Sequence, residues 1–425
     1  MKNVLLIISL SLLGLRAISQ NYTSYLTGSL VNSNTFPNKG LALFGGATDN
    51  TMAMKWFLQR ANGGDVLVLR LTGADEYNTY MNSMGIAVNS IETIVLNNPS
   101  AVSDPYIIGK IDSAEAIFFA DGNQADYFST FFNTSVDSAI RVGVDNRKIA
   151  LGGSGAGMSV LGGIYFTEEF GPLTSSAALS NPFDSLVQLS TDPFLNPYGI
   201  HKQTIFEGNI DNPDKKGRHM VFLALLLKDS LYAKGILCDE MAAVCIDELD
   251  IAHVYGGAPN SDDNVYFIQT NCELSELYPE VMDINTPLTW KRFDKPTKVC
   301  AFKAGQQSGQ SFDLNDWKTN VGGNWEHWWV EAGQLVTGLG TAPICDTASI
   351  AEILFEFFPN PVTEGKLYMT LIENNRVDLF NTQGQRIPIV YYDNAIDLNS
   401  VQNGIYYLSV YTESQRRTFK IVINN

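Results

Sequence analysis

Residues 152–157 have the sequence pattern of a nucleophile elbow. The segment reads Gly-Gly-Ser-Gly-Ala-Gly and lies between two apolar runs. In hydrolases built on a parallel sheet, such a turn joins a strand to a helix so sharply that its apex residue is lifted above the sheet. A serine at the apex attacks the carbonyl carbon of an ester or a peptide bond. The segment therefore predicts acyl-transfer chemistry, provided that Ser154 occupies the apex.

A nucleophile of this kind needs a base and an oxyanion site. The base lies within hydrogen-bond reach of the attacking atom, and donors face the oxygen on which negative charge develops. The loop Asp121-Gly122-Asn123-Gln124 follows an apolar run and is a candidate for the backbone donors. The base is expected on a loop that carries a histidine.

The chain contains four histidines, His201, His219, His253 and His327. No carboxylate or cysteine spacing around them is typical of a site, so we expect structural roles. His219 is expected at the start of a helix, facing solvent or the helix cap. His327 lies in the aromatic cluster 325–329, where core packing is expected and stacking on a sugar is the alternative. His201 is the candidate that could swing toward the elbow.

The elements that must position these residues alternate between strands and helices. Continuous apolar runs of strand type are separated by helical patterns, which predicts an α/β fold with a parallel sheet covered on both faces. Ligands of such sheets bind beyond the carboxyl ends of the strands, where the loop 121–124 and the elbow are expected to meet. The predicted strands are 41–45, 65–70, 92–96, 115–120 and 148–151, and the predicted helices are 51–61, 77–84, 104–112 and 124–143.

The chain is too long for one ordinary core, and its pattern changes along its length. Residues 218–230 predict a strong amphipathic helix, and short strands from about residue 236 form a β-rich extension of a domain at 20–336. Residues 337–349 are expected to be a linker. Residues 350–425 contain short strands with polar turns, a spacing that suggests a small β-sandwich.

Four landmarks in residues 350–425 are specific. They are Phe-Pro-Asn-Pro at 358–361, Val-Asp-Leu-Phe-Asn at 377–381 with Gly384, Asn-Gly-Ile-Tyr-Tyr-Leu at 403–408 and Phe-Lys-Ile-Val at 419–422. In this order they resemble the C-terminal sorting domain of type IX secretion cargo. The resemblance implies that the type IX secretion machinery is a partner, and that the chain is secreted or reaches the outer cell surface. A carbohydrate-binding or adhesion sandwich is the alternative.

The amino terminus has the pattern of a secretory signal peptide at 1–19. Lys2 precedes a short apolar stretch, and small residues precede the expected cleavage site at Gln20. The apolar stretch is too short to span a membrane, and an uncleaved anchor is the alternative. We therefore expect no transmembrane segment in the mature chain.

The chain is acidic, with 28 Lys and Arg against 45 Asp and Glu, for a net charge of −17. This charge argues against a nucleic-acid partner and against binding to anionic lipid. It suits a cationic ligand, but acidic surfaces are common on secreted proteins, and solubility is the preferred explanation. The glycine-rich turn lacks the Gly-Lys-Ser/Thr ending of a phosphate-binding loop, and no cofactor is implied.

Five cysteines are present, and export permits disulfides between them. Their spacing does not match the paired Cys-x-x-Cys pattern of zinc sites, so no metal is expected. The preferred bridges are Cys238–Cys245 and Cys272–Cys300, each of which flanks a turn or loop, with Cys345 as the odd thiol. The spacing leaves other connectivities open.

Five landmarks in the central domain also occur in a specific order. They are Phe44-Gly45-Gly46, the segment 118–124, the elbow, the segment 211–218 and the segment 235–240. They resemble the cyanophycinase family of serine peptidases over residues 22–335. The resemblance implies a flavodoxin- or glutamine-amidotransferase-like α/β fold, and hydrolysis of β-aspartyl-arginine or α-aspartyl peptide bonds.

The catalytic positions of that family fall on unsuitable residues here. With Ala156-Gly157-Met158 in register, the family's nucleophilic serine falls on Gly155 and its threonine on Ser154. The histidine of its Asp-x-His motif falls on Asn209, with Glu207 in place of the Asp. Glycine has no attacking atom, and asparagine cannot accept a proton at neutral pH.

The loop beside the elbow differs as well. Asp121 stands where the family has a glycine, and a carboxylate there would oppose a developing oxyanion. Other positions match the family: Gln124 is kept, Lys215 and Arg218 stand where it has cations that hold substrate carboxylates, and Asp239-Glu240 is also present. The resemblance therefore assigns the substrate and oxyanion region to Asp121, Gly122, Asn123, Gln124, Lys215 and Arg218. The candidate catalytic residues are Ser154, Gln124 and Glu240.

Three changes in one constellation favour a loss of hydrolysis, because removing the nucleophile and the base each cuts such catalysis strongly. The sequence thus predicts a secreted pseudopeptidase that binds a peptide or a glycan in the old cleft. One alternative is an active serine peptidase that cleaves aspartyl peptide bonds with Ser154. Another is a structural or adhesive surface protein whose central domain is only a scaffold.

Overall fold

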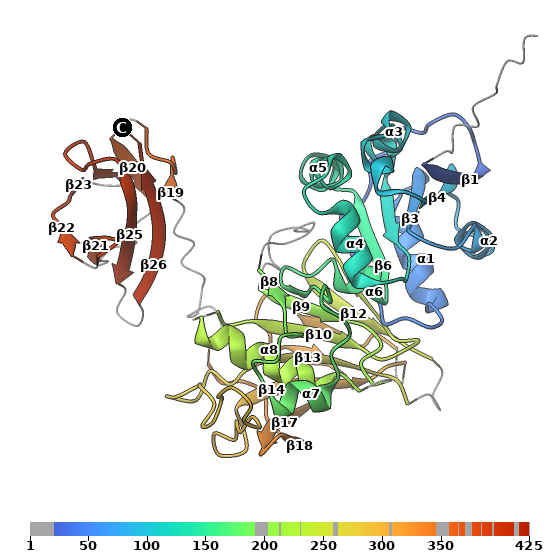
Figure 1. Ribbon diagram of the computed structural model, residues 1–425. Coiled ribbons are helices and arrows are strands. Elements are labelled where there is room, and N and C mark those ends of the chain that lie inside the picture. The colour runs from blue at the N-terminus through green and yellow to red at the C-terminus, as the bar shows by residue number, and fades with distance from the viewer. Residues whose placement is uncertain are drawn as a thin grey trace, which may run out of the picture. The chain divides into compact units, whose positions relative to one another are not determined.

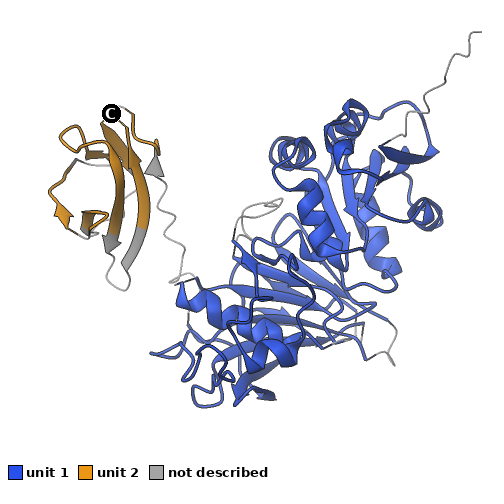
Figure 2. Ribbon diagram, in the orientation of Figure 1, with its two compact units in different colours: residues 1–346 blue, residues 347–425 orange. Residues whose placement is uncertain are grey.

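The structure is a computed structural model in which two compact units, residues 1–346 and 347–425, are distinguished by their internal contacts (Figure 2). The expected signal peptide, His201 and Gly384 lie outside the described residues. The described residues are 21–191, 203–211, 214–229, 231–257, 262–305, 308–345, 357–363, 365–369, 376–383, 385–392, 395–411 and 416–424.

The first unit contains a ten-stranded sheet whose centre is parallel (Figure 1). The order is β1-β4-β3-β5-β6-β2-β11-β12-β15-β16, and the run from β4 to β2 is parallel while the flanking strands are antiparallel. The bounds are β1 Tyr22–Gly28, β2 Leu41–Phe44, β3 Asp65–Arg70, β4 Ser90–Leu96, β5 Ala116–Phe119, β6 Ala150–Ser154, β11 Ala243–Ile246, β12 Ile251–Tyr255, β15 Ser311–Asp313 and β16 Asn320–Val321.

Helices cover both faces of this sheet because successive strand residues point to opposite sides. In β2, Leu41 and Leu43 belong to one apolar core and Ala42 and Phe44 to another. The helices are α1 Thr51–Arg60, α2 Glu76–Asn82, η1 Pro99–Ser103, α3 Pro105–Ser113, α4 Gln124–Phe131, α5 Ser135–Val142, η2 Gly143–Arg147 and α6 Ala156–Ser159.

The single helix expected at 124–143 is wrong, because the structure has two. Asn133 has a positive φ of 57°, which interrupts the helical backbone after α4. Thr134 then caps α5, because its side chain accepts a hydrogen bond from the amide of Asp137.

A second, six-stranded sheet carries the β-rich extension. Its order is β18-β17-β14-β13-β10-β9, and only β9 and β10 run parallel. The bounds are β9 Thr204–Glu207, β10 Lys234–Cys238, β13 Asn264–Thr270, β14 Thr297–Lys303, β17 Asn324–Glu331 and β18 Gln334–Leu339. A separate two-stranded sheet is formed by β7 Tyr165–Phe166 and β8 Leu189–Ser190.

The helix expected to be amphipathic at 218–230 is α8, Lys216–Lys228, and it is buried on most sides. Its apolar residues share one core with α7, Ser175–Ser180, and with the six-stranded sheet. The expectation that His219 faces solvent or its cap is therefore wrong, because the side chain is fully buried within this layer.

The expected disulfides are also wrong, since the structure joins Cys272 to Cys345 with a Cα–Cα distance of 6.3 Å. Cys238 and Cys245 lie on β10 and β11, which belong to different sheets. Cys300 on β14 lies opposite Phe267 on β13, whereas Cys272 follows the end of β13. The unpaired thiols of Cys238, Cys245 and Cys300 are all buried.

Removal of this bridge is expected to destabilise the first unit by about 4 kcal/mol, because the bond closes a long loop, with a sequence separation of 73, in the unfolded chain. The six tryptophans all lie before residue 330, so their fluorescence reports on this unit. Urea unfolding of the Cys272→Ser/Cys345→Ser variant should match that of reduced wild type. Equal stability of oxidised wild type and variant would contradict a structural role.

The second unit is a β-sandwich, as expected. Leu367 and Ile396 from one four-stranded sheet and Leu379 and Leu408 from the other share its core. The strands are β19 Phe357–Phe358, β20 Lys366–Met369, β21 Arg376–Asn381, β22 Arg386–Ile387, β23 Val390–Tyr392, β24 Ala395–Asp397, β25 Gly404–Tyr411 and β26 Arg416–Ile423. The predicted α/β fold with a β-rich extension and a C-terminal sandwich is confirmed. Among the described residues, no helix has the length and apolar character needed to cross a membrane.

Candidate functional site

The elbow is present, and Gly155 is its apex. β6 ends at Ser154, α6 begins at Ala156, and Gly155 between them has φ 53° and ψ −113°. Residues with a side chain rarely adopt this conformation. Gly157 is required as well, because a Cβ there would lie 2.2 Å from the carbonyl oxygen of Phe119. The strand-to-helix turn thus has a glycine at its apex, which carries no side chain.

Ser154 lies one residue before the apex and is buried. Its side chain is only 2% exposed, and its Oγ donates to Asp49 Oδ1 at 2.6 Å. The other oxygen of Asp49 accepts from the Tyr77 hydroxyl at 2.8 Å. Burial raises the pKa of Asp49, while the hydrogen bonds from Ser154 and Tyr77 oppose that rise. The sequence did not single out Asp49, although a polar residue just after a Gly-Gly turn at a strand end is a usable signal.

The described histidines hydrogen-bond elsewhere. His253 Nε2 lies 2.9 Å from Asp247 Oδ2, and His327 Nδ1 lies 2.8 Å from the carbonyl oxygen of Thr297. His219 contacts Glu207, as described below. Within the described residues, Ser154 therefore has a carboxylate neighbour and no imidazole neighbour.

The backbone donors beside the apex are occupied by Asp121. Its Oδ1 accepts from the Ala156 amide at 2.9 Å and from the Gly122 amide at 2.8 Å. In elbow hydrolases, the amide after the nucleophile and an amide from a neighbouring loop face the oxyanion. A Cβ built on Gly155 would lie 2.1 Å from the same oxygen. The Asp121 carboxylate thus accepts hydrogen bonds from both amides and occupies the space that a side chain on Gly155 would fill.

The position expected for the base lies beside the apex. Asn209 has a φ of 49°, and its amide donates to the carbonyl oxygen of Gly45 at 2.7 Å. Its side chain packs on Gly46, where a Cβ would lie 2.5 Å from the Asn209 Oδ1. A Cβ on Gly208 would come within 3.2 Å of the Gly155 Cα. The structure therefore brings together three segments that are far apart in the sequence.

Glu207 forms a buried ion pair below this junction. Its Oε1 accepts from Arg218 Nε at 2.8 Å, and its Oε2 lies 2.6 Å from His219 Nδ1. Burial alone would raise the pKa of Glu207, but the Arg218 charge and the His219 hydrogen bond outweigh it and lower the pKa to about 2. Arg218 also donates to the carbonyl oxygen of Leu173 and lies over the Phe166 ring.

The other predicted binding residues are hydrogen-bonded within the protein. Lys215 Nζ donates to the carbonyl oxygen of Gly208 at 2.8 Å, and burial and the Arg218 charge lower its pKa. Gln124 donates from Nε2 to the carbonyl oxygen of Phe166. Asn123 caps α4, because its Oδ1 accepts from the amide of Asp126 at 3.0 Å.

Carboxyl groups gather where the hairpin 239–242 meets the turn at Gly45-Gly46. Burial and a hydrogen bond with Asp211 raise the pKa of Glu240 to about 7. Burial also raises the pKa of Asp239 to about 6, although its Oδ2 accepts from the amide of Asn264 at 2.8 Å. No set of described residues here or elsewhere has the geometry to hold a metal ion.

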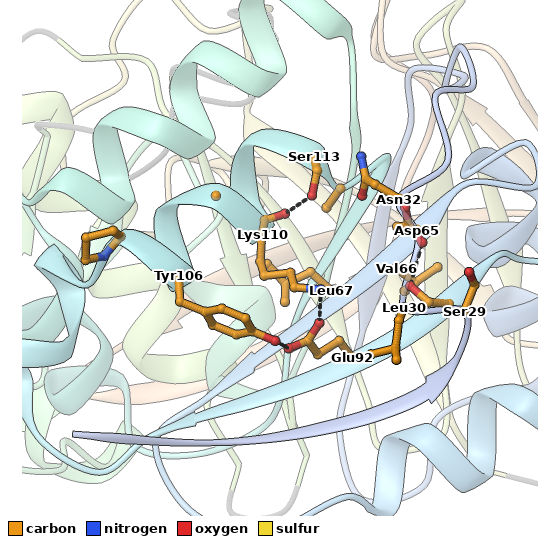
Figure 3. A pocket seen from close by; sticks show the side chains of 14 residues that line it. Ser29, Leu30, Asn32, Asp65, Val66, Leu67, Glu92, Tyr106, Lys110 and Ser113 are labelled. Atoms are coloured by element: carbon orange, nitrogen blue, oxygen red, sulfur yellow. Dashed lines mark hydrogen bonds and ion pairs between the residues drawn. The ribbon is translucent and has the colours of Figure 1, made fainter. Parts of the chain in front are cut away.

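A hollow of about 440 Å³ lies between α3 and the amino ends of β3 and β4, whereas the elbow follows a carboxyl end (Figure 3). Glu92 crosses its floor and accepts from the Tyr106 hydroxyl at 2.6 Å, while Lys110 Nζ lies 2.6 Å from its other oxygen. The sequence did not predict this cluster, although Glu92 is a charged residue inside an apolar strand. The Glu92 carboxylate is thus held by the Tyr106 hydroxyl and by an ion pair with Lys110.

Residues 356–424 match the family model of the secretion system C-terminal sorting domain. No curated protein matches the chain significantly. Among solved structures, it is similar to a peptidase from an acI-B1 actinobacterium, with 15% identity and a TM-score of 0.39 over 54% of this chain and 91% of that one. It is also similar to a Listeria monocytogenes EGD-e protein assigned to peptidase E, with 15% identity and a TM-score of 0.35 over 52% of this chain and 100% of that one. The chain therefore carries a C-terminal sorting domain, which marks it for type IX secretion to the cell surface or the extracellular space.

Proposed function

We propose that the first unit is a cyanophycinase-like pseudopeptidase that binds a peptide or another ligand in the old cleft and does not cleave it. One observation carries the proposal, namely the Asp121 carboxylate on the two amide donors beside a side-chain-free apex at Gly155. Acyl transfer needs an attacking atom at the apex and free donors for the oxyanion. Both requirements fail at the same place.

The electrostatics of the apex support this proposal. A carboxylate fixed on the donors repels the negative charge that a tetrahedral intermediate develops, so the transition state is destabilised rather than stabilised. Asn209 adds no proton acceptor at neutral pH. The fold brings the turn at Gly45-Gly46, the apex and Gly208-Asn209 together, and the proposal places the ligand beside this junction.

A second candidate, an active peptidase that uses Ser154, is favoured by one contact. Asp49 lies 2.6 Å from the Ser154 hydroxyl and has a raised pKa, so it is a conceivable base. The burial of Ser154 and the occupation of the amide donors beside the apex by Asp121 argue against this candidate.

Hydrolysis of aspartyl peptides separates the two candidates. The pseudopeptidase proposal expects no turnover of β-aspartyl-arginine or α-aspartyl peptides by the full chain between pH 5 and pH 9. Ser154→Ala should leave that baseline unchanged, as should the matched Ser159→Ala on α6. Turnover that is lost in Ser154→Ala and kept in Ser159→Ala would establish the peptidase instead.

Binding separates the pseudopeptidase from a structural or adhesive protein. Calorimetric titration with the same peptides and with oligosaccharides is expected to show a complex that Asp121→Ala weakens or strengthens by tenfold or more, about 1.4 kcal/mol. Asp126→Ala, on the exposed side of α4, should leave the affinity unchanged. Absence of binding for the whole panel would favour a scaffold or adhesive role.

A further inference from the structure

β1 is an edge strand without the usual protection. It forms one end of the ten-stranded sheet and pairs only with β4 among the described strands (Figure 1). Natural edge strands are commonly short, or carry charged residues or proline that discourage pairing with another chain. β1 spans seven residues, Tyr-Thr-Ser-Tyr-Leu-Thr-Gly, with neither a charge nor a proline. Such an edge is a template for a further strand.

The surface that continues from β1 is apolar and uncharged. No charged residue occurs from Asn21 to Asn38, although the whole chain has a net charge of −17. Leu30, Val31 and Phe36 in this segment are exposed by 87%, 76% and 88%. Two copies of so acidic a chain repel each other unless they meet through a face without like charges. This segment offers such a face.

The β1 sequence is compatible with itself around a twofold axis. In an antiparallel pair of two β1 strands centred on Tyr25, Tyr25 of one copy lies opposite Tyr25 of the other. Thr23 of each copy then lies opposite Thr27 of the other copy. Aromatic pairs and Thr–Thr pairs are among the favourable cross-strand contacts. Ser24 bonds to Glu92 on the α3 side of the sheet, so Thr23, Tyr25 and Thr27 share the opposite face.

We propose that two copies of this chain associate through β1, with the two edge strands paired antiparallel and the ten-stranded sheets joined into one. A twofold interface of this type uses the same patch on both copies and closes at a dimer. The exposed side chains of Leu30 and Val31 follow directly after the strand and lose water in the assembly.

Sedimentation of the full chain at increasing concentration tests the proposal. A reversible monomer–dimer equilibrium is expected, and the amides of β1 should exchange hydrogen more slowly in the dimer. Tyr25→Lys places two like charges directly opposite each other, so the dissociation constant should rise at least tenfold. Tyr25→Thr keeps a neutral strand former and should retain the dimer.

The charge control is Val321→Lys, on β16 at the other end of the same sheet, where the side chain is 55% exposed. It adds the same lysine to an acidic chain and should leave the dimer intact. Tryptophan fluorescence confirms that each variant is folded. A folded wild type that stays monomeric at every concentration overturns the proposal. A dimer that withstands Tyr25→Lys, or β1 amides that do not change with concentration, also overturns it.

Discussion

Gly155→Ser is expected to destabilise the first unit by about 4 kcal/mol. A serine at φ 53° carries backbone strain on the order of 1–3 kcal/mol. Its Cβ would also lie 2.1 Å from Asp121 Oδ1, so the carboxylate must leave the amides of Gly122 and Ala156. Solvent screens this exposed carboxylate, so its two hydrogen bonds together contribute about 2 kcal/mol. Urea unfolding followed by tryptophan fluorescence measures the loss.

In an Asp121→Ala background, Gly155→Ser should lower the free energy of unfolding by much less. The three atoms nearest to a Cβ on Gly155 all belong to the Asp121 carboxyl group, and alanine removes all three. Only the backbone strain then remains, so the double-mutant cycle should show a coupling of about 2 kcal/mol. Gly85→Ser is the matched control, because Gly85 has a φ of 70° and open space around it. Additive effects of the two substitutions would show that Asp121 does not occupy the apex.

Glu207→Gln is expected to destabilise the first unit by about 3–5 kcal/mol. The change leaves the buried guanidinium of Arg218 without its counter-charge, and breaking a buried pair from one side is costly in this range. His219 also loses a charged acceptor for its Nδ1. The control is Glu76→Gln, which removes the carboxylate of an Arg70 pair whose glutamate is 66% exposed. That variant should change the unfolding free energy by less than about 0.5 kcal/mol.

The pH dependence of Glu207 has a definite sign. Its pKa is lowered from 4.5 to about 2 by folding, so the unfolded chain binds its proton first as the pH falls. The stabilisation is complete above pH 4.5 and is lost as the pH drops toward 2. The stability difference between wild type and Glu207→Gln should therefore shrink over that window. A difference that stays constant from pH 6 to pH 3 would contradict the buried pair.

The local patterns of the chain predict most of the fold. Apolar runs alternate with capped helices along the first unit. The backbone of the elbow requires glycines, so the sequence at residues 152–157 predicts the strand-to-helix turn. The sequence placed the apex on Gly155 only through the alignment of the flanking residues 156–158 with the family pattern. In the structure, Gly155 has a positive φ and lies between β6 and α6. The β-sandwich likewise follows from the spacing of its short strands.

Long-range pairing accounts for what the patterns missed. The burial of His219 depends on Glu207, which lies on another element, and nothing in the helix sequence signals that partner. Cys272 meets Cys345 because the chain returns after β18, a path that cysteine spacing does not encode. The position of the Asp121 carboxylate depends on a hydrogen bond from the Ala156 amide, which belongs to a different segment of the chain.

The proposed loss of the nucleophile is tested most directly by mass spectrometry after treatment with a fluorophosphonate, which reacts with activated serines. The full chain is predicted to keep its unmodified mass under conditions in which an active serine peptidase is labelled completely. Peptide mapping should find neither Ser154 nor Ser159 modified. A stoichiometric adduct on Ser154 that disappears in Ser154→Ala would contradict the account, because it would show that the serine one step before the apex is still an active nucleophile.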